Sequence, residues 1–221
     1  WRHTRSFMMT KLRVLFLHGY GQNERVCRQK TGSLRKILKA KVEFIFARGT
    51  FTADRNGADA EQDGRSWWTR PRSDSEYEGW MESIAEIGKI VQDQGPFDGI
   101  AGFSQGATAA GIVLAAADGR LSGLEHYRVA FSRIQFCILF AGFLPKDPDC
   151  ARLFSREKLT IPSLHVIGET DIIVSQERSL SLASVLKEPE VLKHGGGHYV
   201  PASSQFRPPY EDFLRRFEVC G

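Results

Sequence analysis

The sequence predicts an α/β fold with a mainly parallel central sheet and helices on both of its faces. Short runs rich in Val, Ile and Phe alternate along the chain with segments of helical spacing, which is typical of repeated βαβ units. The 221 residues are 42% hydrophobic and 25% charged, as in a globular protein with an apolar core. Neither an internal repeat nor an interdomain linker interrupts the alternation. We therefore expect one domain over residues 10–221, preceded at 1–9 by an unstructured leader or a remnant of expression.

The apolar runs are the predicted strands. Each is short, rich in β-branched, aromatic or leucine side chains, and bounded by turn residues or charged residues. In chain order they are Leu12–Leu17, Val42–Phe46, Phe97–Gly102, Ile134–Ala141, Ser163–Gly168 and Glu190–Lys193. Because helical segments separate most of them, we expect crossover connections and therefore parallel pairing.

The segments between the strands are the predicted helices. In chain order they are Leu34–Lys39, Glu76–Gln92, Gln105–Ala117, Ser175–Leu186 and Pro209–Phe217. Ser33 is expected to cap the first of them. The third is small and apolar on all sides, which predicts a buried helix that ends at Gly119. The second has one apolar face, formed by Tyr77, Trp80, Met81, Ile84, Ile87 and Val91.

Charge and hydropathy argue against two classes of partner. The formal net charge of +4 is spread over the chain without a run of like charges or a basic and aromatic stripe, so we expect no nucleic-acid binding. The longest apolar run, Phe136–Leu144, contains a glycine and is too short to span a bilayer. The run Leu12–Leu17 is shorter than the apolar region of a secretory signal, and polar residues follow it directly.

The cysteines predict a reduced protein without a structural metal. They form no C-x-x-C pair and have no histidine at metal-ligand spacing; they are Cys27, Cys137, Cys150 and Cys220. The stretch 18–23 is no dinucleotide-binding loop, because residue 24 is not glycine. We therefore expect a cytoplasmic protein with free thiols that uses neither a metal nor a cofactor.

The segment Thr50–Ser75 departs from the α/β alternation. It is polar and acidic over most of its length and then carries the pair Trp67-Trp68. A loop of this length inside a compact domain is usually functional or mobile. We expect a loop here, and a lid that includes the two tryptophans remains one open interpretation.

The pentapeptide Gly102-Phe103-Ser104-Gln105-Gly106 matches the G-x-S-x-G motif of a nucleophilic serine. A predicted strand precedes it and a predicted helix follows it, as the motif requires, since such a serine lies on a strained turn between the two. Glycine suits both flanks, where a side chain would collide as the helix folds back on the strand. We predict that Ser104 is the nucleophile of an α/β-hydrolase fold. The alternative is a glycine-rich turn whose serine only caps the helix.

A nucleophilic serine needs a base to take its proton and an acid to orient the base. In α/β-hydrolases the acid and then the histidine follow the serine. His198 lies on a glycine loop after the last predicted strand and is the favoured base, with His194 as the alternative. Asp171 follows the strand Ser163–Gly168 and is the favoured acid, with Glu169 as the alternative.

Three other acidic or imidazole side chains have less interesting interpretations. His165 lies inside a predicted strand, where we expect a satisfied and partly buried histidine. Asp147 and Asp149 stand beside prolines and are interpreted as an ordinary surface turn.

The negative charge of a tetrahedral intermediate requires backbone N–H donors. The N–H of Gln105, directly after the nucleophile, and that of Tyr20, in the loop after the first strand, are the predicted oxyanion hole. Candidates to line a substrate pocket are Trp67, Trp68, Phe103 and Phe143. Core packing is an equally good interpretation of each of these aromatic residues.

Several stretches, in order over most of the chain, add to the Ser104 pentapeptide: Leu17–Asn23, Arg28–Lys36, Trp67-Trp68, Gly95–Gly99, Gly168–Asp171 and Gly195–His198. Together they resemble the intracellular family of serine hydrolases that includes fungal members and the animal ovarian-cancer-associated esterase. The resemblance implies a small α/β-hydrolase with little or no cap domain and a triad of Ser104, Asp171 and His198. It also implies esterase activity on carboxylic esters, with thioesterase activity among fungal relatives.

The expected function is cofactor-free hydrolysis of a small-molecule carboxylic ester through an acyl-enzyme. The same triad would also serve an acyl thioesterase or a lipid deacylase, and this alternative remains open. A non-catalytic binding protein on the same fold is the third hypothesis, because a fold does not fix a function. The oligomeric state is not predicted.

Overall fold

The computed structural model describes residues 10–53, 63–70 and 73–218. The expected leader at 1–9, part of the segment Thr50–Ser75 and Cys220 lie outside the described residues.

A six-stranded sheet forms the centre of the molecule, and every neighbouring pair of its strands is parallel. The strands are β1 (Leu12–Leu17), β2 (Val42–Ala47), β5 (Gly99–Phe103), β6 (Phe136–Phe140), β7 (Ser163–Gly168) and β8 (Glu190–His194). Their order across the sheet is β2-β1-β5-β6-β7-β8. The predicted parallel sheet is confirmed, and β1 and β7 have the predicted bounds.

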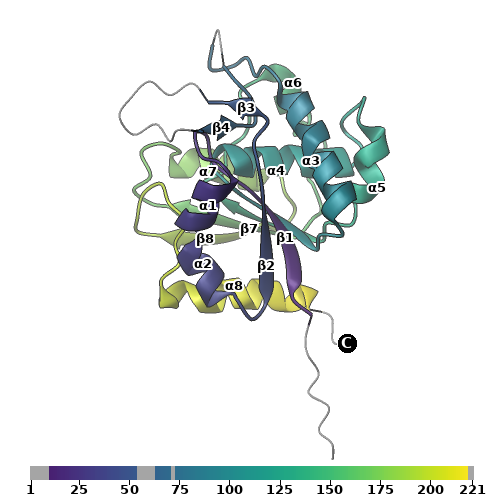
Figure 1. The fold of residues 1–221 in the computed structure, drawn as a ribbon. Coiled ribbons are helices and arrows are strands. Elements are labelled where there is room, and N and C mark those ends of the chain that lie inside the picture. The colour runs from purple at the N-terminus through teal and green to yellow at the C-terminus, as the bar shows by residue number, and fades with distance from the viewer. Residues whose placement is uncertain (1–9, 54–62, 71–72, 219–221) are drawn as a thin grey trace, which may run out of the picture.

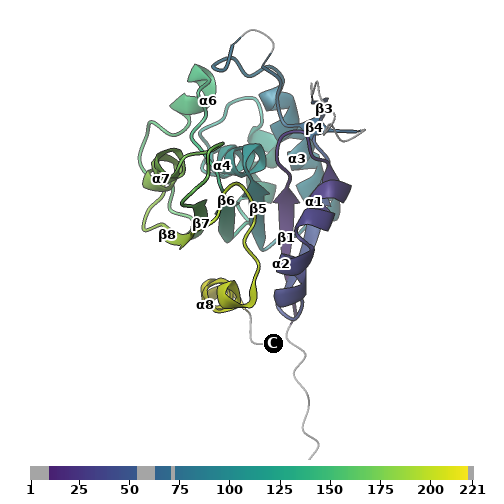
Figure 2. The same ribbon diagram turned by 90° about the vertical axis from the view of Figure 1, so that its left-hand side faces the viewer.

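Helices cover both faces of this sheet, as predicted (Figures 1 and 2). One face carries α1 (Glu24–Lys30), α2 (Gly32–Ile37) and α8 (Arg207–Leu214). The other carries α3 (Trp80–Gln94), α4 (Gln105–Ala117), α5 (Arg128–Phe131), α6 (Pro148–Arg152) and α7 (Gln176–Ser184). Single turns of 3-10 helix, η1 (Glu125–Tyr127), η2 (Ser204–Phe206) and η3 (Arg215–Phe217), complete the helical elements. Each face has its own apolar cluster, so the sheet is buried on both sides.

Helix α4 lies at the centre of its face and is buried almost from end to end. Its predicted bounds are confirmed. Small residues let the helix pack closely on β5, with which it shares many contacts. Gly119, which follows the helix, has a positive φ of 76° and ends it as predicted.

Three short elements differ from the prediction, and side-chain caps rather than hydrophobic spacing define two of them, α1 and α6. Helix α1 was not predicted; the Asn23 side chain caps it by accepting a hydrogen bond from the Val26 N–H. Thr31, and not Ser33, precedes α2. The prediction that Asp147 lies in an ordinary surface turn is wrong. Its carboxylate caps α6 by accepting hydrogen bonds from the N–H groups of Asp149 and Cys150.

The predicted apolar face of the second helix is correct only beyond its first turn. Ile84, Ile87 and Val91 are buried in the core, but Met81 is 37% exposed. Tyr77 lies before α3, because Gly79, with a positive φ of 83°, is not helical and the helix begins only at Trp80. The buried Tyr77 instead accepts a hydrogen bond on its hydroxyl from the Lys146 N–H.

The segment Thr50–Ser75 is not only a loop where the structure describes it. It contains a short antiparallel hairpin of β3 (Phe51–Thr52) and β4 (Arg65–Ser66). Trp67 and Trp68 follow β4 and are 0% and 2% exposed, so both belong to the core. Apart from this hairpin, the described residues form no sheet beyond the central one.

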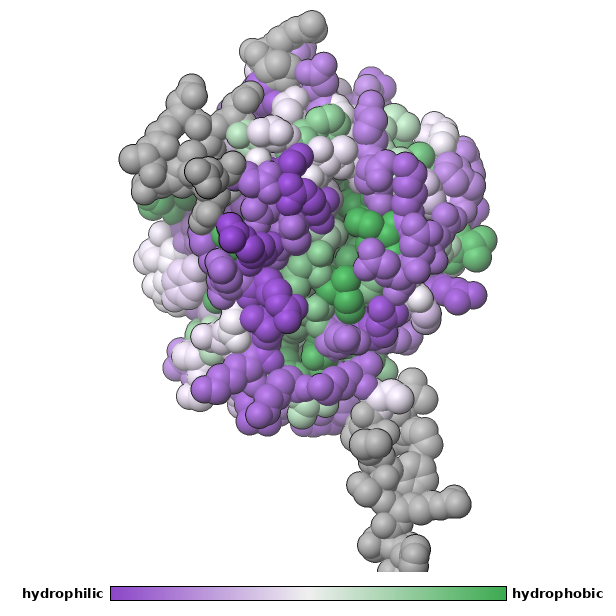
Figure 3. Space-filling model, viewed as in Figure 1, coloured by the Kyte–Doolittle hydropathy of each residue, from purple (hydrophilic) through white to green (hydrophobic). Residues whose placement is uncertain are grey.

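The outer strands of the sheet are β2 and β8. On the face nearest β2, a band of apolar side chains is bordered by polar ones (Figure 3). The exposed Glu43 on β2 lies 3.6 Å from the Arg13 guanidinium. Charges beside an edge strand discourage pairing with another chain.

Within the described ranges, no helix is both long and apolar enough to cross a membrane.

Candidate active site

Ser104 lies on the turn between β5 and α4, at the carboxyl edge of the sheet. Its backbone has φ 53° and ψ −117°, a conformation that residues other than glycine rarely adopt. Its side chain makes no helix-capping hydrogen bond, so the alternative of a serine that only caps the helix has no support. A serine with a strained backbone, at the sheet edge between a strand and a helix, has the geometry of a nucleophile elbow.

The two glycines of the pentapeptide allow this turn for different reasons. A Cβ at residue 102 would lie 2.3 Å from the Gly106 carbonyl oxygen. A Cβ at residue 106 would lie 2.2 Å from the Leu17 carbonyl oxygen at the end of β1. The elbow therefore packs backbone against backbone on both sides, and no side chain fits at either position.

Asp171 and His198 meet at the same edge of the sheet. The Nδ1 of His198 lies 2.7 Å from the Oδ2 of Asp171. The other carboxylate oxygen of Asp171 accepts hydrogen bonds from the N–H groups of Ile173 and Val174, at 2.8 and 2.9 Å. The Asp171 side chain is 1% exposed and the His198 side chain is 19% exposed. A buried carboxylate held in this way orients the imidazole with Nδ1–H as donor and Nε2 as acceptor.

The structure does not bring the alternative pair into this arrangement. His194 is buried, its Nδ1 accepts a hydrogen bond from the Gly196 N–H at 3.3 Å, and burial lowers the pKa of its imidazole. Glu169 is exposed. Neither residue lines the cavity that contains Ser104 and His198.

His165 differs from the prediction of a satisfied histidine. It is buried in β7, and its Nε2 has no hydrogen-bond partner among the described residues. Burial lowers the pKa of its imidazole to about 4. His165 is therefore a neutral core residue at neutral pH.

The loop after β1 that carries Tyr20 is paired with the start of β4. The Gly21 N–H donates to the Arg65 carbonyl at 2.8 Å, and the Arg65 N–H donates to the Gln22 carbonyl at 2.6 Å. The Gly19 N–H donates to the Gln22 side chain at 3.2 Å. Tyr20 lines the same cavity as Ser104 and Gln105.

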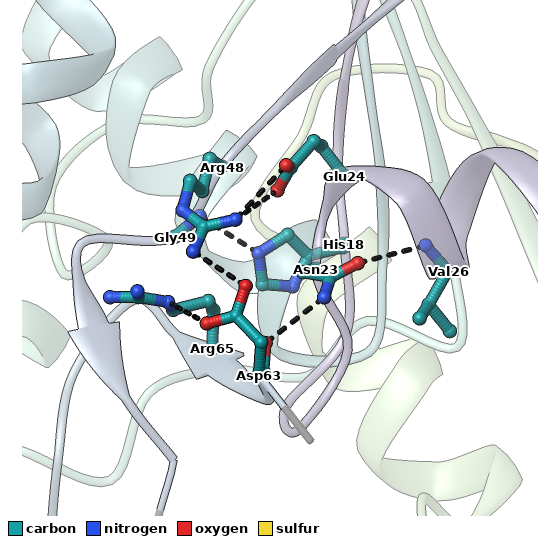
Figure 4. Close-up of polar contacts among 8 residues, drawn as sticks. All are labelled: His18, Asn23, Glu24, Val26, Arg48, Gly49, Asp63 and Arg65. Atoms are coloured by element: carbon teal, nitrogen blue, oxygen red, sulfur yellow. Dashed lines mark hydrogen bonds and ion pairs between the residues drawn. The ribbon is translucent and has the colours of Figure 1, made fainter. Parts of the chain in front are cut away.

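His18 fixes this loop from inside (Figure 4). Its Nε2 accepts a hydrogen bond from the Gly49 N–H at 2.9 Å, and its Nδ1 lies 2.8 Å from the Gly19 carbonyl oxygen. Burial lowers the pKa of the imidazole to about 4, so the ring is neutral at neutral pH and donates from Nδ1. His18 was not among the predicted site residues, and no local pattern signals its role, because its partner Gly49 lies far along the chain.

Gln105 ties the elbow to the tryptophan pair. Its side-chain oxygen accepts from the Trp67 N–H at 3.0 Å, and its side-chain nitrogen donates to the Trp68 carbonyl at 3.1 Å. The Trp67 indole N–H donates to the His18 carbonyl at 2.8 Å. Trp67 therefore connects the residue after Ser104 to the loop of Tyr20. It lies outside the cavity, whereas Trp68 lines it.

Comparison with known proteins places this geometry in a family. The family described as Serine hydrolase (FSH1) matches residues 8–210. The chain belongs to this serine hydrolase family.

The curated relatives of this serine hydrolase carry esterase names. It is 36% identical over 229 residues to Esterase OVCA2 of Danio rerio, covering 94% of this chain and 98% of that protein. It is 38% identical over 223 residues to Esterase OVCA2 of Xenopus tropicalis, covering 93% of each. It is 36% identical to Esterase C25G4.2 of Caenorhabditis elegans, again covering 93% of each. The resemblance seen in the sequence is confirmed.

Solved structures confirm the α/β-hydrolase fold. An acyl-protein thioesterase 2 of Zea mays aligns with a TM-score of 0.61 at 19% identity, covering 93% of this chain and 95% of that one. Esterase PE8 aligns with a TM-score of 0.63 at 18% identity, covering 95% and 94%. At these identities the likeness concerns the fold.

A network of charges surrounds the Tyr20 loop of this serine hydrolase (Figure 4). The Arg48 guanidinium lies 3.0 Å from the Glu24 carboxylate and 2.6 Å from that of Asp63, which also lies 3.0 Å from Arg65. The Asn23 amide donates to the Asp63 carbonyl at 3.0 Å. The loop is thus held to the β3–β4 hairpin by main-chain and side-chain contacts together.

The serine hydrolase has a cavity of about 410 Å³ that brings the predicted residues together. Ser104, His198, Tyr20 and Gln105 line it, as do Trp68, Phe103 and Phe143. A second cavity of about 330 Å³ shares Phe103 and His198 with it and is also lined by Cys27 and Val200. The two cavities therefore adjoin each other at Phe103 and His198.

The described cysteines are not part of the arrangement of Ser104, Asp171 and His198. Cys27, Cys137 and Cys150 are buried free thiols. Burial raises the pKa of the Cys27 thiol to about 12, so it stays protonated at neutral pH. Within the part of the chain that the structure describes, no three His, Cys, Asp or Glu side chains group as metal ligands would.

Proposed function

We propose that this serine hydrolase cleaves carboxylic esters through an acyl-enzyme, with Ser104 as nucleophile, His198 as base and Asp171 as the orienting acid. The observation that carries the proposal is the 2.7 Å contact between His198 Nδ1 and Asp171 Oδ2. His198 and Ser104, whose backbone is strained, line the same cavity. The esterase names of the relatives support the same class of substrate.

In the first half of the reaction, the Oγ of Ser104 attacks the ester carbonyl while Nε2 of His198 takes its proton. The imidazolium is stabilised by the buried Asp171 carboxylate, and it returns the proton to the leaving alcohol. In the second half, His198 takes a proton from the water that attacks the acyl-enzyme, and the imidazolium then gives this proton to the departing Oγ of Ser104 as the acid is released. No metal or cofactor takes part in either half.

The N–H groups of Gln105 and Tyr20 are the proposed oxyanion hole. Gln105 is the first residue of α4, where backbone N–H groups have no partner within the helix. Tyr20 lies in the braced loop on the other side of the cavity. Fixed donors stabilise the developing charge more than water does because they are already oriented.

Acyl thioesters and acyl lipids offer the same carbonyl to the same triad. Hydrolysis of matched ester and thioester chains, measured in parallel, separates these substrate classes by their kcat/KM. Free buried thiols support a reducing, cytoplasmic location. Measurement of the fluorescence of a tagged full-length protein against compartment markers tests that location.

The function is tested by ester hydrolysis with Ser104→Ala and a matched control. Ser122→Ala removes an exposed serine that lies outside both cavities. We expect the wild type and Ser122→Ala to hydrolyse p-nitrophenyl butyrate alike and Ser104→Ala to lose at least about 10³-fold in kcat. Equal hydrolysis by Ser104→Ala would overturn the proposal. A wild type that binds esters without turnover would favour a non-catalytic binding protein.

A further inference from the structure

The cavity beside Ser104 is lined by more positive than negative side chains. The basic residues come from four separate segments of the chain and are Lys30, Arg70, Lys146 and Arg178. Asp74 is the one acidic residue among the described residues that line it. The Asp74 carboxylate lies 2.8 Å from Arg70 and 3.9 Å from Lys146. These two cations share the carboxylate, and the other two do not contact it.

Arg178 is positioned by neutral groups. Its Nη1 donates to the Ile173 carbonyl at 3.2 Å, and its guanidinium carbon lies 4.5 Å from the centre of the Phe143 ring. Phe143 is itself held to α4, because the Thr108 hydroxyl donates to its carbonyl at 2.6 Å. Within the described residues, no carboxylate lies at ion-pair distance from Arg178. The charge is therefore held in place and left uncompensated.

Lys30 is the second cation of the cavity that has no carboxylate at ion-pair distance among the residues that the structure describes. It ends α1 and lines both cavities. Helix α1 covers one face of the sheet and α7, which carries Arg178, covers the other (Figure 2). Positive charges thus stand on two sides of the proposed nucleophile. A cleft lined by one sign of charge attracts ligands of the opposite sign.

We propose that the substrate is an ester that carries an anionic group, a carboxylate or a phosphate, and that Arg178 binds this group. The inference rests on the proposed function, because it assigns a substrate class to the same site. A guanidinium has five N–H donors in a planar fork that matches the oxygens of either anion. Ile173, which lines the cavity and is 61% exposed, offers an apolar contact for the carbon chain between the anion and the ester.

The test compares pairs of esters in which one member carries an anionic group and the other does not. The p-nitrophenyl monoester of adipic acid is assayed against the same compound with its free carboxylate methylated. For an anion on the alcohol side, the acetate of 3-hydroxypropyl phosphate is assayed against the acetate of propanediol. We expect the wild type to have the higher kcat/KM for the anionic member of at least one pair. The pair that shows the preference identifies the carboxylate or the phosphate as the ligand.

Variants assign the preference to Arg178. We expect Arg178→Gln to reduce the anionic-to-neutral ratio of kcat/KM by about tenfold or more, mainly through KM, since a hydrogen bond to a charged group is lost. Arg178→Lys should retain part of the ratio. The control is Arg133→Gln, an exposed position before β6 at the opposite edge of the sheet, which should leave the ratio unchanged. No anionic preference in the wild type, or an equal ratio in Arg178→Gln and Arg133→Gln, would overturn the inference.

A binding measurement separates this inference from the proposed function. Calorimetry with Ser104→Ala should show tighter binding of the anionic than of the neutral ester, and Arg178→Gln in the same background should remove the difference. Hydrolysis of neutral esters that depends on Ser104, without any anionic preference, contradicts the inference and leaves the proposed function standing. Loss of Ser104-dependent hydrolysis for every ester contradicts both.

Discussion

Ser104, whose Oγ begins the proposed reaction, has a strained backbone. A non-glycine residue at such a positive φ costs about 1–3 kcal/mol and persists only where the surrounding structure enforces it. The enforcement here comes from close packing of the elbow against the end of β1. The nearest atoms to a Cβ at Gly106 are those of Leu17 and His18 main chain. Substitution at this glycine therefore tests how the elbow is held.

Gly106→Ala should destabilise the fold. Its Cβ would lie 2.2 Å from the Leu17 carbonyl oxygen, and overpacking of this kind costs about 1–3 kcal/mol. Urea denaturation should therefore show a lower free energy of unfolding. Gly111→Ala is the control in the same helix, because its Cβ would make only van der Waals contacts, with the side chains of Phe154 at 3.5 Å and Leu182 at 3.7 Å. That variant should be neutral or stabilising, and an equal loss in both variants would refute the packing argument.

Asp171→Asn should lower kcat by about 10³- to 10⁴-fold while leaving KM nearly unchanged. An amide in place of the carboxylate neither stabilises the imidazolium nor fixes the tautomer that leaves His198 Nε2 as the acceptor. Steady-state kinetics on a neutral ester measure the effect. Glu169→Gln, at an exposed acid two residues away, should retain full activity. A large loss in Glu169→Gln with little loss in Asp171→Asn would exchange their roles.

At the scale of elements, the two proposed oxyanion donors come from segments that are far apart in the sequence. The loop after β1 and the start of α4 are joined through Trp67, which hydrogen-bonds to both His18 and Gln105. The β3–β4 hairpin that precedes Trp67 is paired with the same loop. This cross-connection makes Trp67 a positioning residue, although it lies outside the cavity.

Trp67→Phe should lower kcat between about tenfold and a hundredfold with a small change in KM. The variant keeps the aromatic packing but loses the indole N–H that donates to the His18 carbonyl, and small displacements of catalytic groups are costly. Trp80→Phe, at a half-buried position on α3, is the matched control and should keep wild-type kinetics. A fall in thermal stability of Trp67→Phe without any change in kcat would assign Trp67 to structure alone.

The long elements could be predicted from hydrophobic spacing, and the short ones could not. Strands β1 and β7 and helix α4 have the predicted bounds because burial on all sides determines their composition. Helices α1 and α6 expose most of their residues and depend on the caps Asn23 and Asp147, which spacing does not detect. The hairpin is too short for any period to appear.

The candidate site shows the same division. Ser104, Asp171 and His198 could be proposed because each follows a strand and the carboxyl ends of parallel strands share one edge. Trp67 and Trp68 were grouped as pocket candidates, but both are buried and only Trp68 lines the cavity, because two adjacent aromatic residues give no sign of which one faces it. The contribution of His18 depends on a main-chain N–H of Gly49, far along the chain, and no local pattern reveals such a partner.

At the scale of the whole molecule, buried neutral histidines make the stability sensitive to acid. Burial lowers the pKa of both His18 and His165 from 6.5 to about 4. Their folded pKa lies below the unfolded one, so the unfolded chain takes up these protons first as the pH falls. The stabilisation is complete above about pH 6.5 and is lost progressively between pH 6.5 and 4.

Each of these histidines should account for a loss of about 2 kcal/mol in the free energy of unfolding between pH 7 and 5. Urea denaturation at both pH values measures the total. His165→Leu removes one titrating group whose Nε2 has no partner among the described residues. Its stability should fall by about 2 kcal/mol less than that of the wild type over this interval. An identical pH dependence in the two proteins would show that His165 does not titrate as described.

The central claim, that Ser104 forms the covalent intermediate, is tested most directly by locating a trapped adduct. The wild type is treated with a fluorophosphonate, digested and analysed by mass spectrometry. The account predicts one phosphonyl group per chain on Ser104, slower labelling in Asp171→Asn, and none in Ser104→Ala. An adduct on any other residue of the wild type, or equal labelling of Ser104→Ala, would contradict it.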